Sequence, residues 1–390
     1  MILFALLQRL FALMSLAIFG LAGWLIWSWW DREREAQAVG LDPSNDRLYW
    51  GLGLLVFSLL GRLVVLLVLG RGGGMPTTRR HEGTAVAGPD GARLRVETQG
   101  QTAGPILLLT HGWGMSSRIW ADARTAFEDR FTVAVWDLPG SGRSMPPSAG
   151  YSIEGFADDL KAVIDSLPSE RPVVLVGHSI GGMTVQTFCA RHPELLDRRV
   201  AGVVLANTTH HDPLRTMILS GPLTGMRPLI MALMKVDVVC SPLLWLMNWQ
   251  SYLSGATHLA MRIAGFGARP TRAQLDLAAR LPTKTSPAVQ ARGNLAMIRW
   301  SVTERLPEVD VPALVFVGGR DLVTKDHAGE FIARTLVRAT LVRVDEAGHM
   351  GPFEQPQTYN EAIAAFVERL PVSAPTAASE TPPPRPAFTA

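Results

Sequence analysis

Residues 172–182 read Pro-Val-Val-Leu-Val-Gly-His-Ser-Ile-Gly-Gly and decide the fold. A short, mostly β-branched apolar run ends in Gly177-His178-Ser179-Ile180-Gly181, and an amphipathic stretch from Met183 to Arg191 follows at once. This order predicts a strand, a sharp turn and a helix, in which the small residues around Ser179 permit a strained turn that presents the serine hydroxyl. Ser179 is therefore a candidate nucleophile. The alternative is a glycine-rich turn between a strand and a helix that carries an incidental serine.

The composition bounds the class of protein. The chain has 390 residues, 47% of them hydrophobic, and a net charge of +3 at pH 7, so it can bury a large core and form more than one domain. No basic block alternates with aromatic residues, and we therefore expect no nucleic-acid partner. Cys189 and Cys240 stand in unrelated contexts without the spacing of metal ligands, so we expect two free, buried thiols.

Two long apolar runs lie near the N-terminus. No charged residue occurs from Leu10 to Trp30, and only Arg62 interrupts the run from Leu48 to Leu69. Each run is long enough to cross a bilayer at about 20 residues per span. Aromatic residues gather where an interface is expected; they are Trp24, Trp27, Trp29, Trp30, Tyr49 and Trp50. We predict a membrane hairpin within residues 1–75, with transmembrane helices at about 10–30 and 48–70, and hence a multi-pass membrane protein.

A cleaved secretory signal is the alternative interpretation of the first run. Ala36-Gln37-Ala38 resembles a cleavage site, but the run is too long, lacks a basic start, and a second span follows it. For Arg62, a side chain that snorkels or faces the other helix is favoured over a functional intramembrane charge.

The arginines near the spans favour one orientation. Counting them predicts that both termini, and with them the large downstream region, lie on the cytoplasmic side. The loop between the spans carries Arg32, Arg34 and Arg47, and the outer flanks carry Arg9, Arg71, Arg79 and Arg80.

Beyond the glycines at 70–74, which predict a flexible tether, strands and helices alternate. This alternation predicts an α/β fold with a doubly wound, mostly parallel sheet. Short strands flank a turn at 88–91, and Ser152 is a candidate N-cap. The other predicted strands cover 94–97, 106–109, 131–136, 172–176, 200–206, 313–317 and 340–344, and the clearest helices cover 153–167, 183–191 and 359–370.

The alternation stops between about 207 and 308. This stretch is rich in Leu, Met, Trp and Pro and is too long for a simple connection, so we predict a helical cap at 208–308 between core segments 76–207 and 309–370. Extra core helices are the alternative. The large apolar side chains of the cap are candidate substrate contacts, in particular Met217, Met231, Trp245 and Trp249. The Pro- and Ala-rich residues 371–390 are predicted to be disordered.

Ser179, Asp321 and His349 each come just after a predicted strand, in the order nucleophile, acid and base. The carboxyl ends of parallel strands share one edge of a sheet, so the three side chains can converge there. His349 would take the serine proton, and Asp321 would hold the histidine tautomer and stabilise its charged form. Taken singly, Asp321 could be a turn residue and His349 a loop histidine. The acids to test if Asp321 proved dispensable are Asp326, Asp345 and Glu346.

A tetrahedral intermediate also needs hydrogen-bond donors for its oxyanion. The expected donors are the backbone N–H groups of Trp113 and Ile180. His111 and His178 are interpreted as structural. The run His210-His211-Asp212 is interpreted as polar loop residues, and no metal site is expected.

With these motifs in order, the chain resembles the α/β-hydrolase superfamily, in its serine esterase or lipase-like branch, from about Thr84 to Leu370. The resemblance implies the fold, the triad and the oxyanion roles given above, and no cofactor. Members with aspartate at the nucleophile position are dehalogenases or epoxide hydrolases, and the serine here argues against both. The matching residues are 111–114 (His-Gly-Trp-Gly), 137–144 (Asp-Leu-Pro-Gly-Ser-Gly-Arg-Ser), 177–182, 319–321 (Gly-Arg-Asp) and 348–349 (Gly-His).

These observations favour a membrane-anchored serine hydrolase, a carboxylesterase or lipase, that cleaves apolar or lipid-like esters through an acyl-enzyme. A domain tethered near a bilayer and a cap rich in Met, Leu and Trp both suit such a substrate. Alternatives with the same triad are carbon–carbon bond hydrolysis, peroxyacid formation and acyl transfer. A non-enzymatic binding or scaffold protein is a further alternative, which predicts a lost triad residue or a blocked oxyanion hole.

Overall fold

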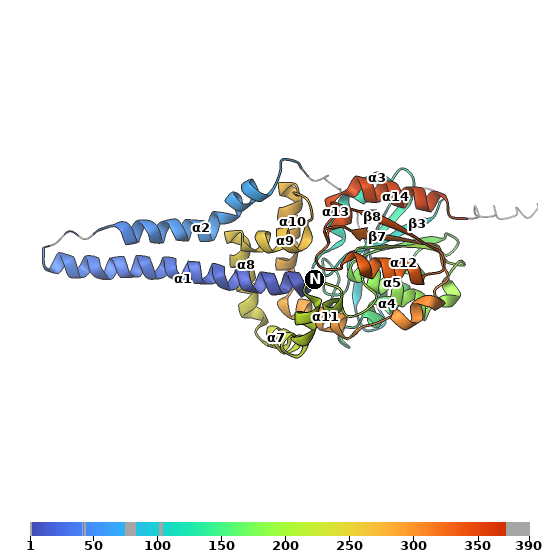
Figure 1. Ribbon diagram of the computed structural model, residues 1–390, viewed down its shortest axis with the longest axis horizontal. Coiled ribbons are helices and arrows are strands. Elements are labelled where there is room, and N and C mark those ends of the chain that lie inside the picture. The colour runs from blue at the N-terminus through green and yellow to red at the C-terminus, as the bar shows by residue number, and fades with distance from the viewer. Residues whose placement is uncertain (1, 41, 43, 75–82, 101–103, 372–390) are drawn as a thin grey trace, which may run out of the picture.

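A computed structural model describes residues 2–40, 42, 44–74, 83–100 and 104–371. Its centre is an eight-stranded sheet in the order β1-β2-β4-β3-β5-β6-β7-β8 (Figure 1). The first two strands are antiparallel to their neighbours, and the remaining pairs are parallel. This confirms the predicted mostly parallel sheet. The strands are β1 (Thr84–Ala87), β2 (Arg93–Gln99), β3 (Ile106–Thr110), β4 (Thr132–Trp136), β5 (Val173–His178), β6 (Val200–Ala206), β7 (Ala313–Gly318) and β8 (Ala339–Val344).

Helices cover both faces of this sheet, which explains why β3, β4 and β5 are buried along their whole length. Figure 1 shows α3 (Ala121–Phe127) and α14 (Pro356–Glu368) on one side. On the other side lie α4 (Ile153–Asp165), α5 (Ile180–Arg191) and α12 (Asp326–Thr335). Ser152 caps α4 as expected, because its hydroxyl accepts from the N–H of Gly155 at 2.9 Å. Shorter helical turns are η1 (Ser117–Trp120), η2 (Pro193–Leu195) and α13 (Gly351–Glu354).

Residues 208–308 are all described and contain helices but no strand of the sheet. They form the proposed cap, which stands at one end of the sheet beside the N-terminal helices (Figure 1). Helices α7 and α8 meet at a bend of 96°. The elements are η3 (Pro213–Arg215), α6 (Ser220–Gly225), α7 (Arg227–Val239), α8 (Ser241–Ser254), α9 (Ala256–Gly265), α10 (Arg272–Lys284), α11 (Pro287–Arg299) and η4 (Thr303–Glu308).

The N-terminal hairpin consists of α1 (Ile2–Ala38) and α2 (Asp46–Leu69), both long and apolar enough to span a membrane. Helix α1 begins well before the predicted span at 10–30. Its first turns are buried against protein, since Ile2 packs in a cluster with cap residues and Phe4 belongs to the main core. The start of α1 is therefore part of the globular body, and only the later part projects from it (Figure 1).

The prediction of a flexible tether at 70–74 is wrong at its beginning. The N–H of Arg71 donates to the carbonyl of Pro270, and the carbonyl of Arg71 accepts from the N–H of Arg272. The guanidinium of Arg269 donates to the last carbonyls of α2, at residues 68–70. This segment is held because the final carbonyls of a helix have no intrahelical donors, and here the cap supplies donors for them. The rest of the predicted tether, 75–82, and the predicted disordered tail from 372 lie outside the described residues.

Arg62 faces the cap and not the other helix of the hairpin. Its Nη1 donates to the hydroxyl of Tyr252 on α8 at 2.9 Å, and its guanidinium lies 5.1 Å from the centre of the same ring. The Tyr252 hydroxyl in turn donates to Oδ1 of Asp276 at 2.8 Å. The Tyr252 hydroxyl thus links the guanidinium of Arg62 to the carboxylate of Asp276. This hydrogen-bonded chain stabilises the arginine charge within the protein.

Candidate active site

Ser179 occupies a strained turn between β5 and α5. Its φ of 56° and ψ of −119° lie outside the regions that L-residues usually adopt. The turn is possible because its neighbours are small: a Cβ on Gly181 would overlap the carbonyl of Thr110. The carbonyl of Ser179 also accepts a hydrogen bond from the hydroxyl of Thr208 at 2.7 Å. The sequence thus holds the serine side chain at the carboxyl end of the central strand.

The structure brings the three predicted polar residues together. Ser179 Oγ lies 2.9 Å from Nε2 of His349, and Nδ1 of His349 lies 3.0 Å from Oδ2 of Asp321. They follow β5, β8 and β7, so the shared strand edge unites them as the sequence predicts. His349 and Asp321 are fully buried, and Ser179 is 5% exposed. With Nδ1 of His349 protonated and facing the carboxylate, Nε2 is free to accept a proton from the serine.

The Asp321 carboxylate is surrounded by hydrogen-bond donors. Oδ1 accepts from the backbone N–H groups of Val323 at 2.7 Å and Thr324 at 2.9 Å. Oδ2 accepts from the Thr324 hydroxyl at 2.7 Å as well as facing His349. Burial alone would raise the pKa of Asp321, but His349 and these donors lower it below its ordinary value. The carboxylate is therefore ionised and can stabilise an imidazolium.

Asn207 connects the loops that carry Asp321 and His349. Its Nδ2 donates to Oδ2 of Asp321 at 3.2 Å and to the carbonyl of Gly348 at 3.0 Å, and its Oδ1 accepts from the Tyr359 hydroxyl at 2.8 Å. Sequence reasoning missed this residue. The sequence feature that could have identified it is its position directly after β6, at the same edge of the sheet as Ser179, Asp321 and His349.

The alternative acids lie elsewhere, on the surface. Asp326 and Asp345 pair with Arg343 at 2.9 and 2.8 Å, and Glu346 pairs with Arg320 at 2.7 Å. Each is therefore held by an exposed arginine, while Asp321 is the acid that faces Nδ1 of His349.

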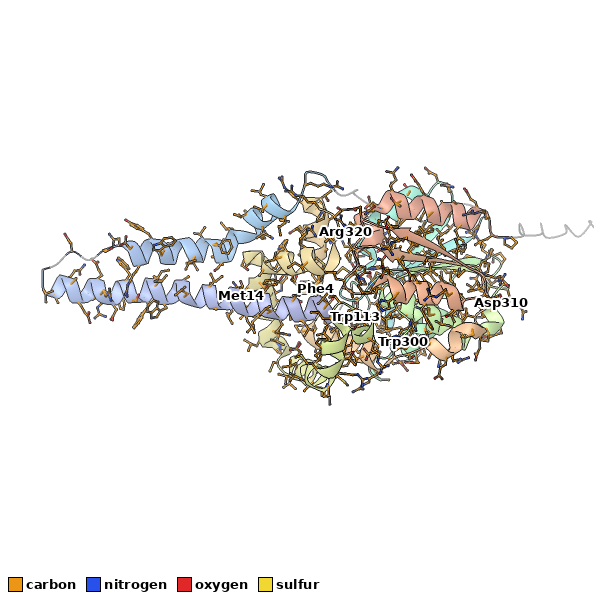
Figure 2. The ribbon with its side chains drawn as sticks, in the orientation of Figure 1. Phe4, Met14, Trp113, Trp300, Asp310 and Arg320 are labelled. Carbon is orange, nitrogen blue, oxygen red and sulfur yellow. The ribbon has the colours of Figure 1, made fainter. Side chains whose placement is uncertain are left out.

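Trp113 joins the loop after β3 to the cap. Figure 2 shows Trp113 where the sheet domain meets the cap. Its indole is buried against Phe156, and Nε1 donates to the carbonyl of Gln290 at 3.0 Å. A Cβ on Gly293 of α11 would overlap the indole ring. Among the described residues, the hydrogen bonds leave the backbone N–H groups of Trp113 and Ile180 without an acceptor. Both are available to an oxyanion, the second at the start of a helix, where N–H groups point outward.

His111 and Asp137 hold the adjacent loops in place. Nε2 of His111 accepts from the N–H of Leu138 at 3.0 Å, so the ring carries its proton on Nδ1, 2.8 Å from the carbonyl of Gly112. Burial lowers the pKa of His111, against the opposing effect of Asp137, and keeps the ring neutral. Asp137 accepts from the N–H groups of Ser117 at 2.7 Å and Arg143 at 2.9 Å. These contacts support the structural role expected of His111.

His178, next to Ser179, supports the loop that carries His349. Its Nε2 donates to the carbonyl of His349 at 2.7 Å. Burial, followed by the proximity of His349, lowers the pKa of His178 to about 3. The ring therefore stays neutral at physiological pH and does not compete with His349 for the serine proton.

Glu354 connects the same loop to the segment between α9 and α10 of the cap. Its Oε2 accepts from the N–H groups of Gly348 at 2.8 Å and Gly267 at 3.2 Å, and its Oε1 accepts from the N–H of Ala268. Burial raises the pKa of Glu354, although these N–H groups partly offset that effect. Sequence reasoning did not predict this contact, because it joins residues far apart in the chain.

Of the candidate substrate contacts in the cap, two are packed in its interior and two are partly exposed. Met217 is buried in a cluster with Leu214 and Ile298, and Met231 packs against that cluster. Trp245 and Trp249 on α8 are 42% and 38% exposed, and the indole N–H of Trp245 donates to the carbonyl of Thr283 on α10 at 2.7 Å. A role of these residues in substrate binding remains a prediction.

The predicted polar loop residues at 210–212 are placed among other side chains. The His210 ring stacks on Phe331 at 4.1 Å, and its Nδ1 lies 2.7 Å from the hydroxyl of Thr303. Within the described ranges, no group of three or more metal-ligating side chains is found.

A family model described as the alpha/beta hydrolase fold matches residues 105–224, which include β3 to β6 and the serine turn. The chain has the α/β-hydrolase fold. Among solved structures, the esterase RhEst1 from a Rhodococcus species is similar with a TM-score of 0.61 and 22% identity, covering 74% of this chain and all of that one. A membrane phospholipase A has a TM-score of 0.57 and 24% identity, covering 82% of this chain and 93% of that one.

Curated relatives cover the same region. "Probable oxidoreductase EphD" of Mycobacterium tuberculosis is 30% identical in an alignment over 312 residues that covers 75% of this chain and 50% of that protein. The chain thus spans about half the length of the first relatives it matches. The 3-oxoadipate enol-lactonase 2 of Acinetobacter baylyi is 25% identical over 277 residues, covering 71% of this chain and 94% of that enzyme.

Proposed function

We propose that the protein is a membrane-anchored serine hydrolase that cleaves carboxylic esters with apolar, lipid-like acyl chains through an acyl-enzyme. The observation that carries this proposal is the chain of contacts from Ser179 Oγ through His349 to Asp321, at 2.9 and 3.0 Å. Such an arrangement lets a hydroxyl that is barely ionised at neutral pH act as a nucleophile.

In the first step, Ser179 Oγ attacks the ester carbonyl carbon while Nε2 of His349 takes the hydroxyl proton. The carbonyl oxygen becomes an oxyanion, which the free N–H groups of Trp113 and Ile180 are available to bind. Asp321 stabilises the imidazolium. When the tetrahedral intermediate collapses, the imidazolium gives its proton to the departing alkoxide, and the acyl group stays on the serine.

The second step repeats the first with water as nucleophile. His349 takes a proton from water, the resulting hydroxide attacks the acyl carbon, and collapse of the second intermediate returns the proton to Ser179. A carboxylic acid leaves, and the triad is restored. No redox partner or metal takes part, since every proton and electron pair is accounted for by the ester, water and the triad.

Several features support a lipid-like substrate. Two helices long and apolar enough to span a membrane precede the hydrolase core. The similarity to a membrane phospholipase A covers more of the chain than the similarity to RhEst1. We further propose, from the arginine distribution, that the hydrolase domain lies on the cytoplasmic side.

The proposal is tested with p-nitrophenyl esters of increasing acyl length and detergent-solubilised protein. Activity is expected to rise toward medium or long chains and to disappear in Ser179→Ala. A fluorophosphonate probe, which reacts only with an activated serine, should label the wild type and not this variant. Equal inertness of wild type and Ser179→Ala in both assays would refute the serine-hydrolase proposal. Activity confined to the shortest esters would refute only the lipid-like substrate.

A further inference from the structure

The corner of the cap formed by α7 and α8 exposes an extended apolar surface. We call residues 227–254 the cap corner. A water-soluble surface rarely collects so many large apolar side chains without a partner. The exposed ones are Leu229, Leu233, Val236, Val239, Leu243, Trp245, Leu246 and Trp249.

Charge is nearly absent from this surface. Helix α8 contains no charged residue from Ser241 to Ser254. On α7, Asp237 is paired with Arg9 of α1 at 2.7 Å, and Arg227 lies 3.3 Å from Asp212. The remaining charged side chain of the cap corner is Lys235, which is exposed. Its long aliphatic chain allows the ammonium group to reach the lipid headgroups. This is the composition of an element that lies in the boundary layer of a bilayer.

The cap corner is attached to the hairpin at a definite level. Leu244 and Met247 pack on Ala12 of α1. At the end of α8, the hydroxyl of Ser254 accepts from that of Ser15 at 2.6 Å. On the other helix, a Cβ on Gly61 would lie 2.6 Å from the Ser254 carbonyl, so α2 and the end of α8 are in direct contact.

Counting along the two helices gives the depth of this level. A hydrocarbon layer of about 30 Å takes about 20 helical residues, so a layer that begins at Trp27 or Trp50 ends near Leu7 on α1 and Gly70 on α2. Ala12 is then about 8 Å inside this edge and Gly61 about 13 Å inside it. Amphipathic helices that lie in a membrane interface typically insert by about 5–10 Å. The cap corner therefore stands within the layer that the hairpin crosses.

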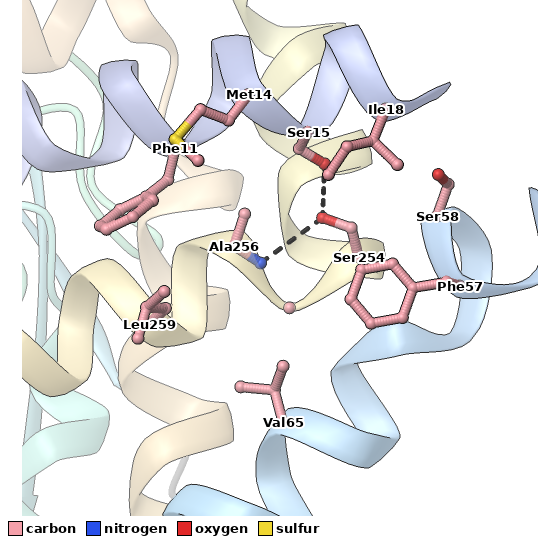
Figure 3. Close-up of a pocket in the computed structure, with 11 residues that line it drawn as sticks. Phe11, Met14, Ser15, Ile18, Phe57, Ser58, Val65, Ser254, Ala256 and Leu259 are labelled. Atoms are coloured by element: carbon pink, nitrogen blue, oxygen red, sulfur yellow. Dashed lines mark hydrogen bonds between the residues drawn. The ribbon is translucent and has the colours of Figure 1, made fainter. Parts of the chain in front are cut away.

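A cavity of about 170 Å³ lies at the same level, between α1, α2 and the turn from α8 to α9 (Figure 3). Its lining is almost wholly apolar and includes Phe11, Met14, Phe57, Val65 and Leu259. The Ser58 hydroxyl on its wall is buried without a partner among the described residues. A space of this kind, opening between two spanning helices, suits a hydrocarbon chain better than water.

We propose that the cap corner is embedded in the leaflet on the hydrolase side of the membrane, with Leu243, Trp245 and Leu246 among acyl chains. The partner of this surface is the hydrocarbon of the bilayer. The cap is thus itself a membrane element, in addition to the hairpin. The inference rests on the proposed membrane anchoring and is independent of the ester chemistry.

The test places an environment-sensitive fluorophore, NBD, at single cysteines of the full chain in phosphatidylcholine nanodiscs. Cys240→Ala removes the half-buried native thiol, and Cys189 stays unlabelled because burial raises its pKa to about 12. Leu246→Cys reports the cap corner. Val56→Cys on α2 is the membrane reference, and Val337→Cys, exposed before β8, is the aqueous reference.

We expect blue-shifted emission at positions 56 and 246, and quenching there by lipids that carry a spin label on the acyl chain. A label near the headgroup should quench position 246 more than one near the chain end. Position 337 should show neither effect. Quenching at position 56 with none at position 246 would overturn the inference and leave the membrane anchoring intact. This holds even if position 246 shows a blue shift, because a blue shift without quenching by lipid means that a second protein copy covers the cap corner. Absence of quenching at 56 would overturn both.

Discussion

Asn207 donates from Nδ2 to Oδ2 of Asp321 at 3.2 Å, the same oxygen that faces His349 at 3.0 Å. The same amide group holds the carbonyl of Gly348, next to the histidine. Acid and base are thus positioned by one side chain that does not itself reach Ser179.

Asn207→Ala should lower kcat by about 100-fold, because a misplacement of about 1 Å at a reacting group has an effect of that size. KM should change little, since Asn207 is a positioning residue. Steady-state kinetics on a soluble ester would check the split between the two constants. Tyr359→Phe removes only the donor to Asn207 Oδ1 and should have a smaller effect. A rise in KM with unchanged kcat would contradict the positioning role.

Asp321→Asn should lower kcat by about 10⁴-fold, because an amide at this position stabilises the wrong histidine tautomer and no imidazolium. The matched control is Asp326→Asn, which replaces a half-buried partner of Arg343 and should leave kcat unchanged. Both variants can be compared by ester hydrolysis and by fluorophosphonate labelling. If Asp326→Asn were the inactive variant, the assignment of the acid would be wrong.

Gly293→Ala should destabilise the protein by about 1–3 kcal/mol, the usual range for overpacking. The new methyl group would overlap the Trp113 indole. The displaced indole would also shift the backbone N–H proposed for the oxyanion, so kcat should fall. Gly221→Ala is the control, since a Cβ there meets no atom within 4 Å and α6 gains a better helix former. Thermal unfolding in detergent measures the stability of both.

Phe4→Ala should lower the free energy of unfolding by about 3–5 kcal/mol, the range for truncating a buried phenylalanine. Phe4 is 2% exposed within the main core, whereas Leu10 on the same helix is 53% exposed. Leu10→Ala should therefore be nearly neutral in denaturant titrations in detergent. Equal effects of the two changes would mean that the first turn of α1 is not part of the folded body.

Asp159 should make stability depend on pH. Burial, with Asp90 and Asp158 nearby, raises the pKa of Asp159 from 3.8 to about 7. The folded protein then retains a proton that the unfolded chain has released, so this contribution is complete below about pH 4 and is lost as pH rises through 7. Asp159→Asn should flatten the fall in melting temperature over this range, and exposed Asp129→Asn should not. A parallel fall in both variants would assign the effect to another group.

Much of the core could be predicted from the sequence for a physical reason. Buried parallel strands are short apolar runs between Gly, Pro and polar residues, so β5 and β6 stand out, and the residues that follow them share one edge. This is why Ser179, Asp321 and His349 were placed together, although their catalytic roles remain proposals. Asn207 follows β6 by the same rule, but its role depends on contacts with two distant loops, and a single asparagine does not predict these.

The hairpin and the cap show where sequence reasoning stops. The residues from Ile2 to Leu7 have the composition of the span that follows, because apolar side chains suit a protein core and a lipid equally well. In the same way, α8 carries apolar residues on most of its surface, so the sequence does not distinguish the side that packs on α1 from the exposed side.

The hydrogen bonds between Arg71 and residues 270 and 272 have a mechanical consequence. A short run of chain, 267–272, is attached at one end to α2 and at the other, through Glu354, to the N–H of Gly348 beside His349. A spanning helix tilts to match the thickness of its membrane. A change in the tilt of α2 within the proposed membrane would therefore be transmitted through this linkage to the backbone beside His349, the proposed general base.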